Sequence, residues 1–169
     1  MLLSNNAMQL TQNLKKRLLL YFLTSIFIVF IDQCTKKTIL LKVGLNNTSE
    51  LIPGIIQFFV VQNTGGAFSL FKQYPICFQV IGIVNVFIFS YLTLCPTVTF
   101  NTLMKTGCAC ILGGTIGNLI DRFFQGGVVD FLDLQLFNFA VFNLADVFID
   151  LGVVLILIGW FLSKKIEIK

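Results

Sequence analysis

The sequence predicts a mainly α-helical membrane protein, with four transmembrane helices and a small β-rich cradle at the outer membrane surface. Three observations carry this prediction. The 169 residues are 56% hydrophobic and 12% charged, and their mean hydropathy of +0.88 is too high for a soluble globule. Four apolar runs approach the roughly 20 residues that a bilayer-spanning helix needs. Residues 55–62 are rich in β-branched and aromatic side chains but too short to span.

The first span follows a basic cluster at residues 15–17, and its apolar run covers residues 18–31. A basic cluster before an apolar run also begins a cleavable signal peptide, but no small-residue cleavage site follows this one. We therefore expect a retained span over residues 18–36. Before it, residues 1–14 show no sustained pattern and predict a loose tail, within a cytoplasmic amino-terminal segment over residues 1–17.

Three further apolar runs predict spans over residues 76–95, 102–121 and 143–162. A proline stands just outside the amino-terminal end of the first of these runs, and another follows its last residue. In the second run, Gly113 and Gly117 form a small-xxx-small pattern, which lets helix backbones approach closely. With the first span, these runs complete a four-span bundle.

Two non-cytoplasmic loops, over residues 37–75 and 122–142, connect the spans, and residues 18–169 are expected to form a single domain. In the first loop, residues 42–47 predict a polar connection. A Pro-Gly turn signal then precedes residues 55–62, which predict a strand or strand pair lying at the membrane surface.

Four spans place both ends of the chain on one side of the membrane. Basic residues favour the cytoplasmic side. Seven of the twelve basic residues fall on the side of the termini: Lys15, Lys16, Arg17, Lys105, Lys164, Lys165 and Lys169. This side is therefore predicted to be cytoplasmic, while all acidic residues except Glu167 fall toward the opposite side.

Polar side chains gather where the spans reach that outer side. They are Asp32, Asn63, Asn118, Asp121, Arg122, Asn143 and Asp146, with Asp130 in the loop between the last two spans. Ionisable groups at membrane depth are costly and by default indicate function. Two carboxylates brought together would share a proton and suit acid/base chemistry.

Simpler structural roles compete with the functional ones. Asn143 and Asp146 stand where a helix N-terminus favours capping and acidic residues, which explains Asn143 well and the deeper Asp146 less well. The adjacent Asp121 and Arg122 predict an ion pair that neutralises the aspartate and makes it scaffold, with a guanidinium that snorkels or binds a lipid phosphate. Asp150 shares the face of Asp146 but has no evident partner.

The turn at Asn63-Thr64-Gly65-Gly66 likewise has two interpretations. It is a simple turn, or its glycines permit close approach of an extended peptide whose backbone Asn63 would bond. Residues Gly126 and Gly127 predict a bend before the apolar strand that carries Asp130. Neither segment alone specifies a function.

The composition also excludes classes of site. The chain has no histidine, which excludes Ser-His-Asp and Cys-His triads and argues against a zinc site. Its five cysteines are odd in number and form no CxxC pair, so neither a redox motif nor a complete disulfide set is indicated. Most are expected to be small packing residues. We predict no metal and no cofactor.

Five stretches, in this order, resemble the bacterial lipoprotein signal peptidase family (signal peptidase II), over about residues 18–162. Any one stretch is a weak signal, whereas five in order are specific. Where the family often has alanine this chain has Gly66, and the family's proline near Ala140 is missing. The stretches are Asp32-Gln33-Cys34-Thr35-Lys36, Asn63-Thr64-Gly65-Gly66-Ala67-Phe68-Ser69, Gly113-Gly114-Thr115-Ile116-Gly117-Asn118-Leu119-Ile120-Asp121-Arg122, Val128-Val129-Asp130-Phe131 and Phe142-Asn143-Leu144-Ala145-Asp146.

The resemblance implies an intramembrane aspartic endopeptidase of the bacterial inner membrane. It would cut diacylglyceryl-modified prolipoproteins just before the lipid-bearing cysteine, with Asp130 and Asp146 as the catalytic pair. It also implies a small β-cradle between the first two spans. Residues expected to support the pair or hold the substrate are Asp32, Lys36, Asn63, Gly65, Asn118, Asp121, Arg122 and Asn143. The expected partners are prolipoprotein substrates and membrane lipid, without nucleic acid, and the expected state is a monomer.

Two other classes of function stay open at this point. A small proton-coupled transporter would use the buried acids as a relay, but it should distribute them through the membrane depth, and internal repeats are common in transporters. Here the acids crowd one side, and no repeat is evident. A non-catalytic membrane scaffold would use Gly113 and Gly117 for assembly.

Overall fold

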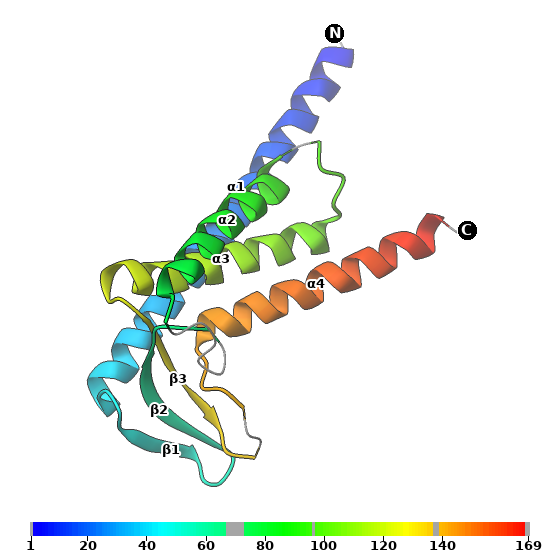
Figure 1. Cartoon of the computed structure of the whole chain (residues 1–169). Coiled ribbons are helices and arrows are strands. Elements are labelled where there is room, and N and C mark those ends of the chain that lie inside the picture. The colour runs from blue at the N-terminus through cyan, green and yellow to red at the C-terminus, as the bar shows by residue number, and fades with distance from the viewer. Residues whose placement is uncertain (1, 67–72, 96, 137–138, 168–169) are drawn as a thin grey trace.

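The computed structural model describes residues 2–66, 73–95, 97–136 and 139–167. Four long helices form a bundle, and a three-stranded sheet lies at one end of it (Figure 1). All four helices are long and apolar enough to cross a membrane, which confirms the predicted class. The elements are α1 (Leu2–Val43), β1 (Thr48–Ile52), β2 (Ile56–Asn63), α2 (Pro75–Leu94), α3 (Thr102–Phe124), β3 (Val128–Leu134) and α4 (Leu144–Glu167).

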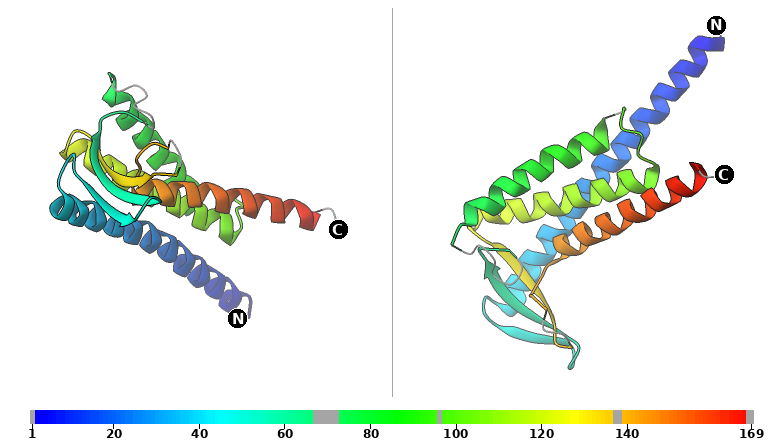
Figure 2. Two further views of the ribbon diagram at one scale, coloured as in Figure 1. Left: turned by 90° about the horizontal axis from the view of Figure 1, so that it is seen from below. Right: turned by 45° about the vertical axis from the view of Figure 1, so that its right-hand side comes forward.

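The start of α1 and the end of α4 lie at the end of the bundle away from the sheet (Figures 1 and 2). This agrees with the even number of spans. Three of the four predicted spans begin within one residue of their helices, α2 at Pro75, α3 at Thr102 and α4 at Leu144, and α4 runs five residues beyond its predicted end, to Glu167. The helix α3 runs three residues beyond the predicted span, to Phe124.

The helix α1 differs most from prediction. Residues 2–14 are helical rather than a loose tail, and the helix continues seven residues past Lys36. No glycine or proline occurs before Gly44, so nothing in the sequence interrupts the helix. Gly44 then ends it with a φ of 85°, and its N–H bonds the carbonyl of Leu40 at 3.0 Å, as in a helix C-cap.

The helix α3 is the centre of the bundle. It packs against each of the other three helices and is largely buried, whereas they expose most of their apolar surface. A Cβ on Gly113 would lie 2.8 Å from the Ser25 carbonyl oxygen of α1, and one on Gly117 would lie 2.5 Å from an Asp32 carboxylate oxygen. The small-xxx-small pair therefore serves contact within the chain, not the assembly that the scaffold hypothesis needs.

The sheet is antiparallel in the order β1-β2-β3. Its strands come from both connecting loops, β1 and β2 from the loop between α1 and α2 and β3 from the loop between α3 and α4. The strand predicted at residues 55–62 is β2. The polar connection predicted over residues 42–47 is shorter than expected, because α1 reaches Val43 and β1 begins at Thr48. The strand β3 comes from the second loop, more than sixty residues later in the chain.

The sheet packs on the end of α1 through a small apolar core. Val60, Val129 and Phe131 are buried there, and partly buried side chains of α1, Leu40 and Val43 among them, pack against them. This contact explains why α1 extends beyond its predicted end. Residues 67–69, the last part of one quoted stretch, lie outside the residues that the structure describes.

Candidate active site

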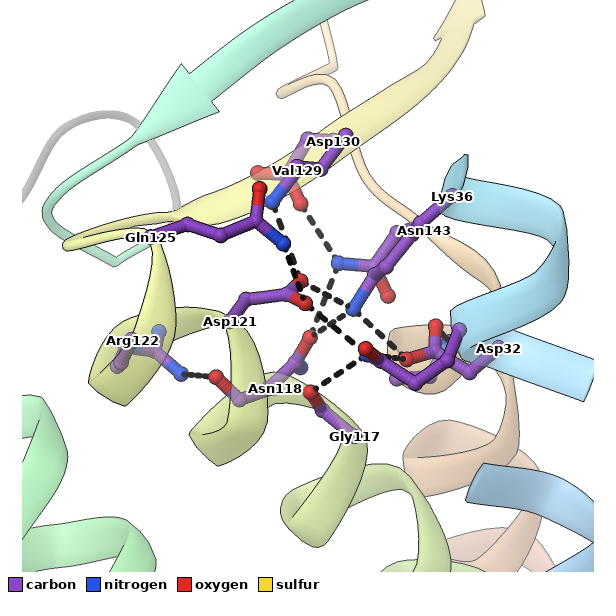
Figure 3. A network of polar contacts seen from close by, with 12 residues as sticks. Asp32, Lys36, Gly117, Asn118, Asp121, Arg122, Gln125, Val129, Asp130 and Asn143 are labelled. Carbon is purple, nitrogen blue, oxygen red and sulfur yellow. Dashed lines mark hydrogen bonds and ion pairs between the residues drawn. The ribbon is translucent and has the colours of Figure 1, made fainter. Parts of the chain in front are cut away.

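Asp130 lies on β3, where it pairs in register with Val61 of β2. The side chain is buried. The Asn143 side-chain nitrogen donates to one carboxylate oxygen at 2.6 Å, and that of Asn63 donates to the other at 3.0 Å. The bond from Asn143 joins β3 to the start of α4 (Figure 3). Two strands and one helix N-terminus thus fix this carboxylate.

The environment of Asp130 favours its protonated form. Burial, and after it the negative charge of Asp146, raise the pKa of Asp130 to about 6. The hydrogen bonds from Asn63 and Asn143, with the positive charge of Lys36, act against this rise because they stabilise the ionised form. A carboxyl group with such a pKa can hold or release a proton near neutral pH.

Asp146 lies in the first turn of α4 and forms a reciprocal cap with Asn143. The Asn143 backbone N–H donates to an Asp146 carboxylate oxygen at 3.1 Å, and the Asp146 N–H donates to the Asn143 side-chain oxygen at 3.1 Å. This is a capping-box arrangement. The other Asp146 oxygen accepts from the Asn118 side-chain nitrogen at 2.8 Å. The capping interpretation therefore applies to both residues, and it leaves Asp146 fixed in orientation.

Asn143 connects the two carboxylates. Its side chain is fully buried, and its amide nitrogen donates to Asp130 and also to the Asn118 side-chain oxygen, at 3.1 Å. Asn118 in turn donates to Asp146. The predicted site residues Asn118 and Asn143 therefore form a hydrogen-bonded link between Asp130 and Asp146.

Lys36 is the centre of a buried charge cluster next to this link. Its ammonium lies 2.9 Å from an Asp32 carboxylate oxygen and 2.8 Å from one of Asp121, and it donates to the Asn118 side-chain oxygen at 2.9 Å. Lys36 is 2% exposed, and both aspartates are 0% exposed. Charges this deeply buried must be paired. The cluster thus holds α1 to α3 directly beneath the site.

The second oxygen of Asp32 positions α4. It accepts the backbone N–H of Ala145 at 3.0 Å, one residue before Asp146. Gln33 adds to the same junction: its side-chain nitrogen donates to the Gly117 carbonyl at 3.1 Å and to Asp121 at 2.9 Å. The sequence indicates no role for Gln33 beyond its place beside Asp32 in a motif.

The prediction that Asp121 pairs with Arg122 is wrong. The partner of Asp121 is Lys36, and the Val129 backbone N–H also donates to Asp121, at 3.3 Å. Adjacent residues on a helix point in different directions, so Asp121 faces α1 and β3, while Arg122 lies apart (Figure 3). Asp121 thereby links α3 to the strand that carries Asp130.

Arg122 faces the cavity instead. Its guanidinium lies over the Phe78 ring, 5.5 Å from the ring centroid, and donates to the Asn118 carbonyl at 3.4 Å. Its Nε is buried and has no hydrogen-bond partner among the described residues. A free donor on a cationic side chain is available to a bound carbonyl, ester or phosphate oxygen.

The turn after β2 presents Asn63 and Gly65 to the same space. The Gly65 N–H donates to the Asn63 side-chain oxygen at 2.9 Å, while the Asn63 nitrogen bonds Asp130. This closes a local turn and aims the Asn63 amide at the carboxylate. The simple-turn interpretation is thus correct for the oxygen of Asn63, and its nitrogen has a second partner.

A cavity of about 400 Å³ opens at this junction. Asp130 and Asp146 both line it, together with predicted residues of the β2 turn and of α3. Four predicted residues are buried and do not line it: Asp32, Lys36, Asp121 and Asn143. The wall also includes Asp150 and residues 139–142, for which the sequence predicts no site role. Thus Asn63, Gly65, Asn118 and Arg122 face the cavity, and the others support it from behind.

The family model for signal peptidase II matches residues 24–162, which is most of the chain and all of the site just described. The chain belongs to the signal peptidase II family. The transporter alternative finds no support in this match.

Individual relatives agree with the signal peptidase II assignment. The lipoprotein signal peptidase of a Nostoc species is 40% identical over 141 residues, which cover 83% of this chain and 88% of the relative. That of Lactobacillus johnsonii is 35% identical over 152 residues, covering 89% and 98%. A bacterial membrane enzyme solved by the in meso method at 2.3 Å resolution superposes with a TM-score of 0.78, at 29% identity, covering 85% of this chain and 88% of that one. The fold of this chain is therefore shared with that solved bacterial membrane enzyme over 85% of its length.

Proposed function

We propose that this protein is an aspartic endopeptidase that removes signal peptides from diacylglyceryl-modified prolipoproteins, with Asp130 and Asp146 as its catalytic pair. One observation carries the proposal. Two carboxylates from separate elements, β3 and α4, line one cavity at the end of a membrane-spanning bundle. Membership of the signal peptidase II family supports the same substrate class.

The chemistry follows from the paired carboxylates. Because two nearby carboxylates do not both ionise readily, they share one proton. The ionised member removes a proton from a water molecule, which attacks the carbonyl carbon of the scissile peptide bond. The protonated member donates a hydrogen bond to the carbonyl oxygen. When the tetrahedral species collapses, a carboxyl proton goes to the leaving amine, and the carboxylates exchange roles.

Three asparagines orient the two carboxylates for this reaction cycle. Asn63 and Asn143 donate to Asp130, and Asn118 donates to Asp146. Amide nitrogens are donors only, so they fix the carboxylate oxygens without competing for the shared proton. The cluster of Asp32, Lys36 and Asp121 is the scaffold beneath them.

Two cavity residues are proposed to hold the substrate. The free Nε of Arg122 is a donor for an oxygen of the substrate, either a peptide carbonyl or an ester of the lipid group. Gly65, which has no side chain, lets an extended peptide pass close to the β2 turn. The apolar surfaces of the helices leave the lipid tails in the bilayer while the peptide bond reaches water.

The proposed setting is the bacterial inner membrane, with the termini cytoplasmic and the cavity facing the periplasmic side. The basic residues Lys15, Lys16 and Arg17 of α1 and Lys164 and Lys165 of α4 support this orientation through the positive-inside rule. The sheet lies at the opposite end of the bundle (Figure 1). The cavity is lined by residues of β2, β3 and the start of α4. Residues 18–169 would act as one peptidase domain, as a monomer.

The test of the substrate class uses purified protein and two precursors that differ only at the lipidated cysteine. The lipidated precursor is expected to be cut immediately before its modified cysteine, as read by mass spectrometry of both products. A precursor with serine at that cysteine cannot be lipidated and is expected to stay intact. Cleavage of both precursors at equal rates, or of neither, would contradict the proposal.

A further inference from the structure

Asp150 is an acidic side chain within the apolar stretch of α4 that the catalytic proposal does not use. It is exposed and lines the same cavity as Asp130 and Asp146. It makes no hydrogen bond or ion pair with any residue that the structure describes. It therefore differs from the buried aspartates Asp32 and Asp121, whose oxygens are occupied.

The position of Asp150 on α4 indicates which part of a substrate its unpaired carboxylate would meet. Asp150 follows Asp146 by four residues, so it lies on the same helix face and about 6 Å further along α4, away from the sheet. It falls within the candidate membrane span Leu144–Lys164. A polar side chain at that depth is costly unless something in the cavity satisfies it.

A signal peptide supplies a group of the required kind. A peptide bond can be attacked only when the backbone around it is extended, so a signal peptide entering the cavity must unwind near the cut. Unwinding frees backbone N–H groups, and in a membrane each free N–H needs an acceptor. The residues before the cut belong to the membrane-embedded part of the substrate, which places them on the deeper side of the catalytic pair.

We propose that Asp150 is a substrate-binding residue, whose side-chain oxygen accepts a hydrogen bond from a backbone N–H on the signal-peptide side of the cleaved bond. This inference rests on the proposed function and extends it to the membrane-embedded part of the cavity. The free donor of Arg122 and the free acceptor of Asp150 give the cavity both halves of a backbone-binding site.

The rival role for Asp150 is electrostatic, in which its charge adjusts the proton affinity of the catalytic pair. Two substitutions distinguish the two roles. Asp150→Asn keeps an acceptor oxygen but removes the charge, whereas Asp150→Val removes both at similar size. Binding through an acceptor predicts that asparagine rescues activity, and a charge role predicts that it does not.

The experiment measures kcat and KM on the lipidated precursor for the wild type and both variants. Loss of a hydrogen bond to a charged carboxylate predicts a fall in kcat/KM of about tenfold or more for Asp150→Val. This fall should appear mainly in KM, because the contact is made in the bound substrate as well as in the transition state. Asp150→Asn should stay within about threefold of wild type, with an unshifted pH profile.

Leu151→Ala is the matched control, since Leu151 is an exposed neighbour on α4 that does not line the cavity. It should leave kcat/KM unchanged, and thermal unfolding should show all variants folded. A precursor in which an ester replaces one backbone amide before the cut lacks that N–H donor. The wild type should cleave it more slowly than the all-amide precursor, whereas Asp150→Val should cleave the two precursors equally fast.

Two results would overturn the inference. One is wild-type kinetics in Asp150→Val, and the other is an Asp150→Asn defect equal to that of valine with a displaced pH profile. Both require a wild type that cleaves the precursor. A wild type that cleaves nothing would instead contradict the proposed function.

Discussion

The side-chain nitrogen of Asn143 lies 2.6 Å from a carboxylate oxygen of Asp130. The same residue caps α4 through its side-chain oxygen, which accepts the N–H of Asp146. Asn143 therefore sets the positions of both carboxylates. It caps the helix that carries Asp146, and its side chain bonds the carboxylate of Asp130. The cap and the site are one structure.

Replacing Asn143 should therefore damage both stability and activity. Asn143→Ala removes an N-cap, worth about 0.5–2 kcal/mol, and leaves buried partners unsatisfied at about 1–3 kcal/mol. We expect a lower unfolding temperature in detergent and a kcat at least about tenfold lower, because Asp130 loses its orientation. Asn47→Ala, which removes an exposed bond to the Val43 carbonyl, is the control and should change kcat little.

Asp121→Asn should act mainly on stability. Lys36 would keep Asp32 but lose one of its two carboxylate partners, and breaking a buried ion pair costs about 3–5 kcal/mol. We expect a strongly reduced free energy of unfolding, with the fraction that stays folded retaining turnover. Thermal unfolding and the activity per folded molecule measure this. Near-normal folding without turnover would contradict the scaffold role of Asp121.

The raised pKa of Asp130 predicts the pH dependence of the reaction. If the catalytic pair needs one shared proton, kcat/KM should fall as the pH rises through about 6, the pKa of Asp130. The folded value lies above the ordinary 3.8, so the native state binds this proton more tightly than the unfolded chain. The resulting stability is present below that ordinary value and is lost as the pH rises through about 6. Initial rates and unfolding temperatures on both sides of that pH measure both effects.

Asn63→Ala should move this limb of the pH profile to higher pH. The Asn63 side chain donates to Asp130, and that bond lowers the pKa of the Asp130 carboxyl. Its removal raises the pKa further, so the active protonated form persists at higher pH. A profile of kcat/KM that moves to lower pH, or does not move, would show that the bond is not made in the working enzyme.

The sequence predicts the helices well because the membrane imposes a simple rule. Every span must be a long apolar run, and α2, α3 and α4 follow their runs to within a few residues. The extension of α1 to Val43 lies outside this rule. The sequence permits it, because no glycine or proline occurs before Gly44, but it is held by packing against Val60 and Phe131, which come close to α1 only when the sheet forms.

The site was partly predictable from the membrane topology. Topology brings the polar ends of the spans together, and six of the ten predicted site residues line one cavity while the other four are buried outside its lining. The partners within the cluster were not predictable, because adjacency in sequence suggested Asp121 with Arg122. The fold instead places Lys36 of α1 between two aspartates. Likewise, the pairing of β3 with β2 depends on contacts between two loops, which local sequence patterns do not encode.

The central claim is that Asp130 and Asp146 act together on one peptide bond. The most direct measurement is the turnover of a lipidated precursor by Asp130→Asn and Asp146→Asn, each shown to be folded by thermal unfolding. Asp133→Asn is the matched control, because Asp133 lies on the same strand and bonds Gln57 outside the cavity. If the two carboxylates act together, neither catalytic-pair variant should show detectable cleavage, and the control should cleave at nearly the wild-type rate. Full activity in Asp130→Asn or in Asp146→Asn would contradict it.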